Sequence, residues 1–154
     1  MLLQRDQIVV LVFEIEEHRY GIDTESVHEI VRAVSPTRLP KAPDVVMGLV
    51  NVRGEAVPLI DLRLRFGLPT RALGLHEVFV IVSARGRRCA LRADAVRELE
   101  RVPRESVSPP PPRSQYAAGT TALADGLLVI CDLDAFLEEA ELLRLDAALA
   151  EAAP

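Results

Sequence analysis

The stretch GLVNVRGEAVPLIDL, from Gly48 to Leu62, returns in altered form as GTTALADGLLVICDL, from Gly119 to Leu133. The two copies align without a gap. Each begins with glycine, turns at its middle, continues through apolar residues and ends on Asp-Leu. The upstream sequence repeats as well, because the apolar residues 10–13 correspond to residues 79–82. Solenoid repeats have shorter periods, so this repeat predicts two copies of one small module.

Each copy predicts five short strands with tight turns and no long helix between them. Apolar and β-branched runs in the first copy predict strands over residues 7–15, 19–22, 27–33, 46–52 and 56–60. The second copy predicts strands over 77–84, 87–92 and 96–102, then a hairpin about Asp125-Gly126. This pattern is typical of small antiparallel barrels. We therefore expect a mainly β fold of two five-stranded barrels, with the groove between them as the natural binding site.

The end of the chain has a helical period instead. Apolar residues recur at helical spacing at Leu133, Phe136, Leu137, Ala140 and Leu143, with a second stripe at Leu142, Leu145 and Leu149. We expect a C-terminal helix over about 133–150 that docks on the barrels. A helix that binds a partner is the alternative interpretation.

Composition bounds the class of protein. The 154 residues are 49% hydrophobic and 4% aromatic, without tryptophan, and carry a net charge of −5. This predicts a real core, while the scarcity of aromatic residues and the scattered arginines argue against a nucleic-acid partner. The longest apolar run, residues 8–13, is far too short to cross a bilayer, and no leader pattern opens the chain. We expect a soluble cytoplasmic protein without membrane insertion.

Known catalytic and metal motifs are missing from the sequence. There is no nucleophile elbow, phosphate loop or dinucleotide fingerprint, and the three histidines lack the spacing of a helical metal motif. Asp61 and Asp132 occupy the same position of the two copies, each before a helix start, which favours capping over a catalytic pair. Cys89 and Cys131 lie in apolar runs and are expected to be buried thiols. We expect no enzyme, no cofactor and no metal.

One stretch of the chain strongly resembles the signature of the CheW family of bacterial chemotaxis coupling proteins. It is GLVNVRGEAVPLIDLR, residues 48–63, and further matches are residues 20–23, 27, 29–30, 37–40, 65–68, 94–96 and 127–133. The resemblance covers about residues 7–138 in the right order. It implies one domain over residues 1–154 with two five-stranded SH3-like barrels. By the repeat we expect the first barrel over about 7–68 and the second over about 76–133.

The resemblance also implies a function. It implies a non-catalytic scaffold that links the cytoplasmic tip of chemoreceptors to a CheA-type histidine kinase, recruited to membrane-associated receptor arrays. The regulatory domain of that kinase resembles CheW, so the two would pair barrel to barrel in alternating rings. A CheW-like adaptor of a non-flagellar system, serving pili, development or gene regulation, is an alternative. A β-barrel ligand-binding domain or an enzyme with an unrecognised site is the competing class.

The family residues implicated in partner contacts carry over to five positions here, namely Val27, Glu29, Gly48, Asn51 and Arg53. A guanidinium at a hairpin tip can make bidentate bonds to a partner, which favours Arg53. The second copy has Ala124 in its place. The alternatives are a solvated turn charge for Arg53 and an ordinary core residue for Val27. The sequence departs from the family pattern at His28, at Arg92-Ala93 and at residues 117–121.

Overall fold

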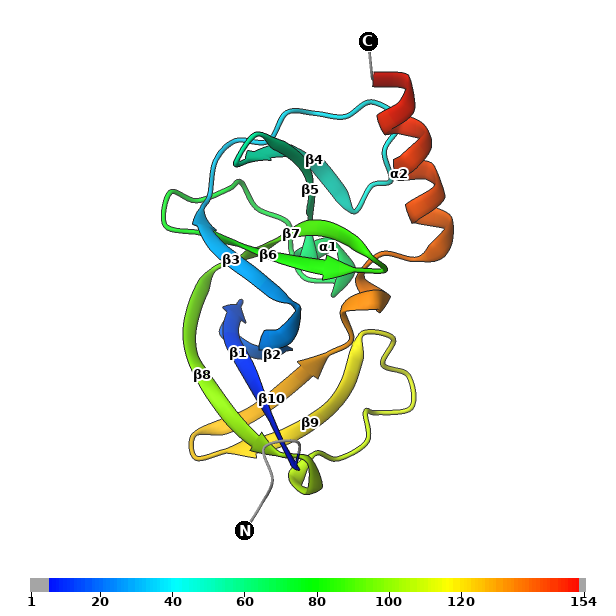
Figure 1. Cartoon of the computed structure of the whole chain (residues 1–154). Helices are drawn as coiled ribbons and strands as arrows, with labels where there is room; N and C mark the ends of the chain where they lie inside the picture. The colour runs from blue at the N-terminus through cyan, green and yellow to red at the C-terminus, as the bar shows by residue number, and fades with distance from the viewer. Residues whose placement is uncertain (1–5, 153–154) are drawn as a thin grey trace.

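A computed structural model describes residues 6–152, which form two five-stranded sheets and a C-terminal helix (Figure 1). The first copy supplies β1 (Gln7–Ile15), β2 (His18–Asp23), β3 (Val27–Arg32), β4 (Val46–Val52) and β5 (Glu55–Ile60). The second supplies β6 (Val78–Ala84), β7 (Arg87–Ala93), β8 (Ala95–Pro103), β9 (Ala117–Leu123) and β10 (Gly126–Cys131). The helical segments are η2 (Thr24–Ser26), α1 (Leu62–Arg65), η3 (Arg104–Ser106), η4 (Leu133–Phe136) and α2 (Glu139–Ala152). The predicted mainly β fold class is confirmed.

The two copies exchange strands. Sheet A has the order β8-β1-β2-β10-β9, and sheet B has the order β3-β6-β7-β5-β4. Replacing each strand by its equivalent in the other copy converts one order into the other, so the two halves are related by an internal two-fold. Contiguous barrels over about 7–68 and 76–133 are therefore a wrong prediction. After the single turn of η2, β3 pairs with β6 of the second copy, in the register Val27↔Val82, and leaves β1 and β2 in the other sheet.

Each sheet closes on itself through a short bridge. Thr37, beyond the end of β3, pairs with Leu49 of β4, and Ser108 pairs with Thr120 of β9 in the same way. Each sheet also contains one parallel pair, β2 with β10 in sheet A and β5 with β7 in sheet B. The sequence predicted antiparallel barrels, so this part of the prediction is wrong. The closed sheets give two similar β units that meet along the middle of the molecule (Figure 1).

The hairpin turns follow from local sequence. In the β4–β5 turn, Arg53 and Gly54 have φ angles of 52° and 84°, the left-handed conformations that a tight hairpin turn requires. Arg85 and Gly86 repeat this geometry between β6 and β7. The β9–β10 turn lies at Ala124 and Asp125, one residue before the predicted position, because Gly126 is already part of β10.

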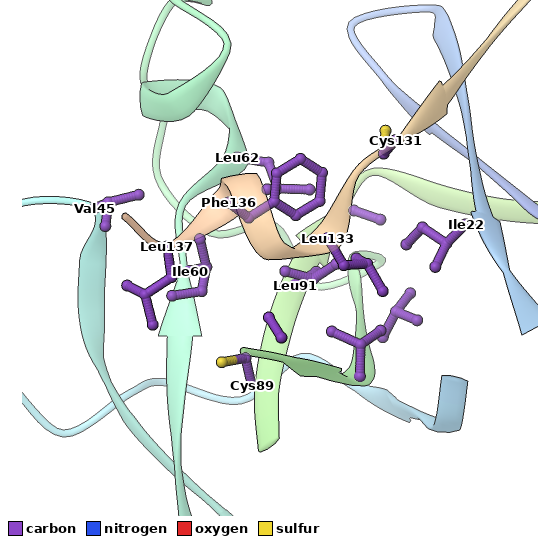
Figure 2. Packing of buried hydrophobic residues seen from close by; sticks show 14 of the residues in the cluster. Ile22, Val45, Ile60, Leu62, Cys89, Leu91, Cys131, Leu133, Phe136 and Leu137 are labelled. Atoms are coloured by element: carbon purple, nitrogen blue, oxygen red, sulfur yellow. The ribbon is translucent and has the colours of Figure 1, made fainter. Parts of the chain in front are cut away.

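The two β units share one hydrophobic core. Figure 2 shows Ile22 and Cys131 of sheet A close to Leu91 of sheet B, with Leu133 and Phe136 of η4 between the sheets. All five belong to one cluster of buried residues. Cys89 and Cys131 are both buried free thiols, as predicted, and burial raises the pKa of Cys89 to about 12. Each β unit also has an inner cluster of its own, which includes Leu59 and Phe79 in sheet B and Val10 and Leu128 in sheet A, and the shared cluster joins the two units.

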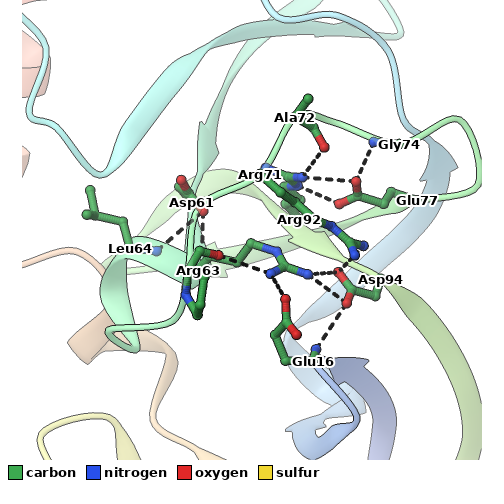
Figure 3. Close-up of polar contacts among 11 residues, drawn as sticks. Glu16, Asp61, Arg63, Leu64, Arg71, Ala72, Gly74, Glu77, Arg92 and Asp94 are labelled. Carbon is green, nitrogen blue, oxygen red and sulfur yellow. Dashed lines mark hydrogen bonds and ion pairs between the residues drawn. The ribbon is translucent and has the colours of Figure 1, made fainter.

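A buried arginine ties the two β units together beside this core (Figure 3). The Arg63 side chain is 2% exposed, donates to Asp94 at 2.8 and 2.9 Å and to the Pro69 carbonyl at 3.1 Å, and pairs with Glu16. The Glu16 amide donates to Asp94 at 3.0 Å. The helix α1 that follows sheet B is thereby held against the β1–β2 turn of sheet A.

The equivalent contact in the other copy has reversed charges. Asp134, two residues after the helix cap as Arg63 is, accepts a hydrogen bond from the Arg85 amide at 2.8 Å. The Arg85 side chain donates to the carbonyls of Asp134 and Leu137 at 3.0 and 2.6 Å. The two clamps occupy equivalent places, but only the Arg63 clamp is buried.

A second buried ion pair explains one departure from the family pattern. Arg92, in β7, donates to Glu77 at 2.5 and 2.9 Å, and both side chains are almost fully buried. Its second terminal nitrogen also donates to the Ala72 carbonyl at 3.0 Å. These contacts fix the connection between α1 and β6 against sheet B (Figure 3). Arg92 thus has a structural role that depends on Glu77.

The predicted helix over about 133–150 is two helices. The η4 turn, capped by Asp132, ends at Phe136, and Leu137 is extended with a φ of −134°, so that α2 begins only at Glu139. The extended Leu137 lets two successive side chains, Phe136 and Leu137, reach the core before the chain turns along sheet B. Leu143, assigned to the docking stripe, is 67% exposed, whereas Leu145 is buried.

Candidate functional site

Strand β3 places one charged residue on its inner face. Side chains along β3 alternate between half-buried and exposed, and the half-buried ones are Val27, Glu29 and Val31. Successive side chains of a strand point to opposite faces, so Glu29 lies on the same side as two apolar residues. A partly exposed carboxylate in that position can accept charge-assisted hydrogen bonds from a cation at the edge of the strand.

The β4–β5 hairpin supplies such a cation. The Arg53 side chain donates from Nε to both carboxylate oxygens of Glu29, at 3.2 and 3.1 Å, and its Nη2 lies 3.0 Å from Oε2. Asn51 stabilises the turn, since its Oδ1 accepts the Gly54 amide at 2.8 Å. The bond from Arg53 holds the pKa of Glu29 below its usual range, and Glu29 raises the pKa of Arg53.

This ion pair spans a groove between β3 and β4, the edge strands of sheet B. We call this groove the β3–β4 groove, and its volume is about 240 Å³. Its lining residues are Glu29, Val31, Arg32, Val34, Val50, Asn51, Val52, Arg53 and Phe79. Valines and Phe79 form its floor, and the Arg53 side chain, 80% exposed, stands at its rim. The groove therefore combines an apolar floor with an accessible guanidinium, which suits binding of another protein.

Three of the five predicted site residues, Glu29, Asn51 and Arg53, meet at this groove. Val27 lies outside it, half-buried against the shared core. Gly48 also lies outside it, and a Cβ there would stand 2.5 Å from the Thr37 carbonyl oxygen. The structure thus gives Gly48 a packing reason, because it lets the bridge between Thr37 and Leu49 form.

Sequence reasoning missed the floor of the groove. Val31, Val50 and Val52 read as ordinary strand residues, and Phe79 comes from the other copy through strand exchange. The detectable signal was Glu29, a charged residue in phase with Val27 and Val31 on β3. It indicates a polar contact on an otherwise apolar strand face.

A larger groove of about 890 Å³ lies at the equivalent place on sheet A, beside β8 and the β9–β10 hairpin. There Glu98 stands in the place of Glu29, but Ala124 replaces Arg53, so this ion pair cannot form. Arg19 pairs instead with Asp125 of the hairpin at 2.6 Å. The sheet A groove therefore has different surface chemistry on the same backbone.

Among residues 6–152, the structure brings together no group of three histidine, cysteine, aspartate or glutamate side chains suited to a metal ion. None of the helices in the same range is long and apolar enough to cross a membrane.

Comparison with known proteins places this geometry in context. Residues 9–141 match the model of the CheW-like domain family. The chain is 28% identical over 141 residues to the chemotaxis protein CheW of Klebsiella aerogenes, which covers 88% of this chain and 85% of that protein. It is also 36% identical over 107 residues to the protein FrzA of Myxococcus xanthus, covering 69% of this chain and 66% of FrzA.

A solved structure agrees in fold. The crystal structure of the scaffolding protein TtCheW from Thermoanaerobacter tengcongensis aligns with a TM-score of 0.79 at 33% sequence identity. The alignment covers 85% of this chain and 92% of that protein. The likeness extends over both β units.

Proposed function

This chain belongs to the CheW-like domain family and is a chemotaxis adaptor, and we propose that it joins a CheA-type histidine kinase to chemoreceptors. The kinase partner is its regulatory domain, and the receptor partner is the cytoplasmic tip. The scaffold works without catalysis, cofactor or metal. Recruitment to receptor arrays at the membrane follows from binding to the receptors.

The observation that carries this proposal is the Glu29–Arg53 pair at the rim of the β3–β4 groove. Arg53 lies at a hairpin tip, where it can exchange part of its contact with Glu29 for a carboxylate of the partner. The apolar floor beneath it can accept an apolar side chain. Buried apolar area would contribute to the binding free energy at such a surface. Charge complementarity would fix the orientation of the partner.

The experiment that tests this function is reconstitution of kinase activity. Membranes that contain the receptors of the source organism are mixed with a CheA-type kinase and this chain, and transfer of radiolabelled phosphate to the kinase is followed. The chain should raise receptor-dependent autophosphorylation and leave the activity of the kinase alone unchanged. No increase with any CheA-type kinase of that organism would contradict the proposal.

The pathway served is a second question. The same scaffold in a non-flagellar system, controlling pili, development or gene expression, remains a candidate, since one relative at 36% identity is named FrzA and not CheW. Deleting the gene and scoring both swimming and surface movement separates the two. Loss of swimming alone assigns the chain to flagellar chemotaxis.

A further inference from the structure

The internal two-fold is broken by the C-terminal helix. On the sheet B unit, α2 packs over a face that contains Val45, Ile60 and Cys89, and its own Leu145 and Ala148 are buried in the same cluster. The helix runs beside β4 and β5 (Figure 1). Residues 6–152 contain one such helix, although they form two β units.

Acidic residues hold α2 in this place, through ion pairs with cations around the face. Asp146 pairs with Arg87 of β7, Glu141 pairs with Arg65 of α1, and Glu151 pairs with Lys41 at 3.1 Å. Two kinds of contact therefore hold α2 on the sheet B unit. Apolar side chains of α2 pack against the core, and its carboxylates pair with cations around that contact.

The repeat places an equivalent face on the sheet A unit. The Asp61 amide donates to the Val45 carbonyl at 2.7 Å, and the Asp132 amide donates to the Tyr116 carbonyl at 2.8 Å. Tyr116 therefore stands where Val45 stands in the other unit. By the same correspondence of strands, Tyr20 takes the place of Cys89, and Cys131 takes the place of Ile60.

This second face is open and hollowed. It forms a pocket of about 310 Å³, here called the aromatic pocket, lined by Tyr20, Phe66, Arg113, Ser114, Gln115, Tyr116, Ala117, Val129 and Cys131. The ring of Phe66 stacks on Tyr20 with centroids 4.7 Å apart and contacts Tyr116 at 5.9 Å. These packed rings form a rigid wall of the aromatic pocket. Tyr20 is partly buried there, and this burial raises its pKa to about 12. No residue is shared with the β3–β4 groove.

The rim of the aromatic pocket carries an available positive charge. Arg113 is exposed and is the one charged residue of the lining, and it forms no ion pair or hydrogen bond with the other residues of the range 6–152. Arg113 lies at the edge of an apolar surface, as do Arg65 and Arg87, which pair with the carboxylates of α2 on the other β unit. A carboxylate on a bound helix could form an ion pair with the Arg113 guanidinium.

We propose that the aromatic pocket is the docking site of an amphipathic helix from a partner protein, seated as α2 is seated on the other β unit. The occupant places leucine-like side chains over Tyr20, Phe66 and Tyr116. It places a carboxylate beside Arg113. This site is additional to the kinase and receptor contacts assigned above and does not depend on them.

The two tyrosines of the chain provide a selective probe, because both line this pocket. The full chain is labelled with 3-fluorotyrosine, and its ¹⁹F spectrum is followed during titration with a peptide of residues 138–152, EEAELLRLDAALAEA. This peptide is the helix that fits the equivalent face. A matched peptide with Leu145→Glu is the control.

The expected result is a saturable shift of both ¹⁹F signals with the first peptide and none with the control. Arg113→Glu should weaken binding about fivefold, the scale of one exposed ion pair, while Arg113→Lys retains it. Both variants change an exposed side chain, so folding is preserved. Unmoved signals at millimolar peptide, or equal binding by Arg113→Glu and the wild-type chain, would overturn the proposal.

Discussion

The β4–β5 and β9–β10 hairpins occupy the same place in the two β units, yet they carry different ion pairs. In sheet B, Arg53 reaches across a groove to Glu29 on β3. In sheet A, Glu98 is present, Ala124 stands where the arginine would be, and Arg19 pairs with Asp125 instead. The two copies share the apolar strand residues that form the core, and they differ in the exposed residues of the hairpins. The proposed partner surface at the β3–β4 groove therefore depends on Arg53, for which the second copy has no equivalent arginine.

Separating the copies should have the largest effect, because folding requires strands from both. Fragments cut near Pro69 leave β1 and β2 without β8, β9 and β10, and they leave β3, β4 and β5 without β6 and β7. We expect each fragment alone to lack a cooperative thermal transition by far-UV circular dichroism. Two independent cooperative melts would refute strand exchange between the copies.

The two interunit clamps should differ in strength. Arg63→Ala leaves Asp94 and Glu16 without their buried partner and should cost about 3 kcal/mol in the free energy of unfolding. Asp134→Ala removes the equivalent contact at an exposed position and should cost about 1 kcal/mol or less. Urea denaturation of both variants measures the difference. Equal losses would show that burial of the Arg63 clamp is not what makes it strong.

The two glycines that open the repeated stretch should both reject a side chain, and Gly48 should do so more strongly because its φ is also 150°. A Cβ at Gly48 would stand 2.5 Å from the Thr37 carbonyl oxygen, and one at Gly119 would stand 2.4 Å from Val107 Cγ1 and 2.9 Å from the Ser108 carbonyl oxygen. Each Gly→Ala variant should lose about 1–3 kcal/mol of stability by overpacking. Gly48→Ala with native stability and weakened kinase binding would instead make Gly48 a contact residue.

Acid should weaken the Arg63 clamp. Burial by itself raises the pKa of Asp94, but hydrogen bonds from the Glu16 amide and Arg63, with the charge of Arg71, lower it overall. The folded pKa lies below the unfolded value of about 3.9, so its stabilisation is present above that pH and disappears as the pH falls through the folded pKa.

Asp94→Asn provides the measurement for this pH effect. The wild-type chain should be more stable than the variant at pH 7, and the difference should shrink as the pH falls below about 4. Urea titrations at several pH values follow it. A difference that does not change with pH would exclude Asp94 as a titrating member of the clamp.

The sequence predicts the local structure of this protein well because the determinants are local. Strand alternation, the Arg53-Gly54 turn and the Asp61 cap are each set by a few neighbouring residues, and the structure has them all. Strand pairing could not be predicted, because β3 and β8 are equivalent by the repeat. The repeat does not say which of the two pairs with β1, and in the structure it is β8.

The candidate site was predictable only in part for the same reason. Glu29 and Arg53 were identified by resemblance, and their contact became visible only when β3 and the β4–β5 hairpin were placed on one sheet. Phe79 enters the groove from the second copy, so no reading of the first copy alone could find it. The start of α2 was misplaced because the helical period continues through Leu137, which is extended.

The most direct test of this account is calorimetric binding of the chain to the regulatory domain of its CheA-type kinase, without added cofactor or metal. The wild-type chain is compared with Arg53→Ala and with Asp125→Ala, which removes the ion pair from the equivalent hairpin. Both positions are at exposed turns, so thermal melts should shift little. We expect Arg53→Ala to lose about 2 kcal/mol of binding free energy and Asp125→Ala to bind as the wild type does. Equal binding by all three proteins would contradict the assignment of function to the β3–β4 groove.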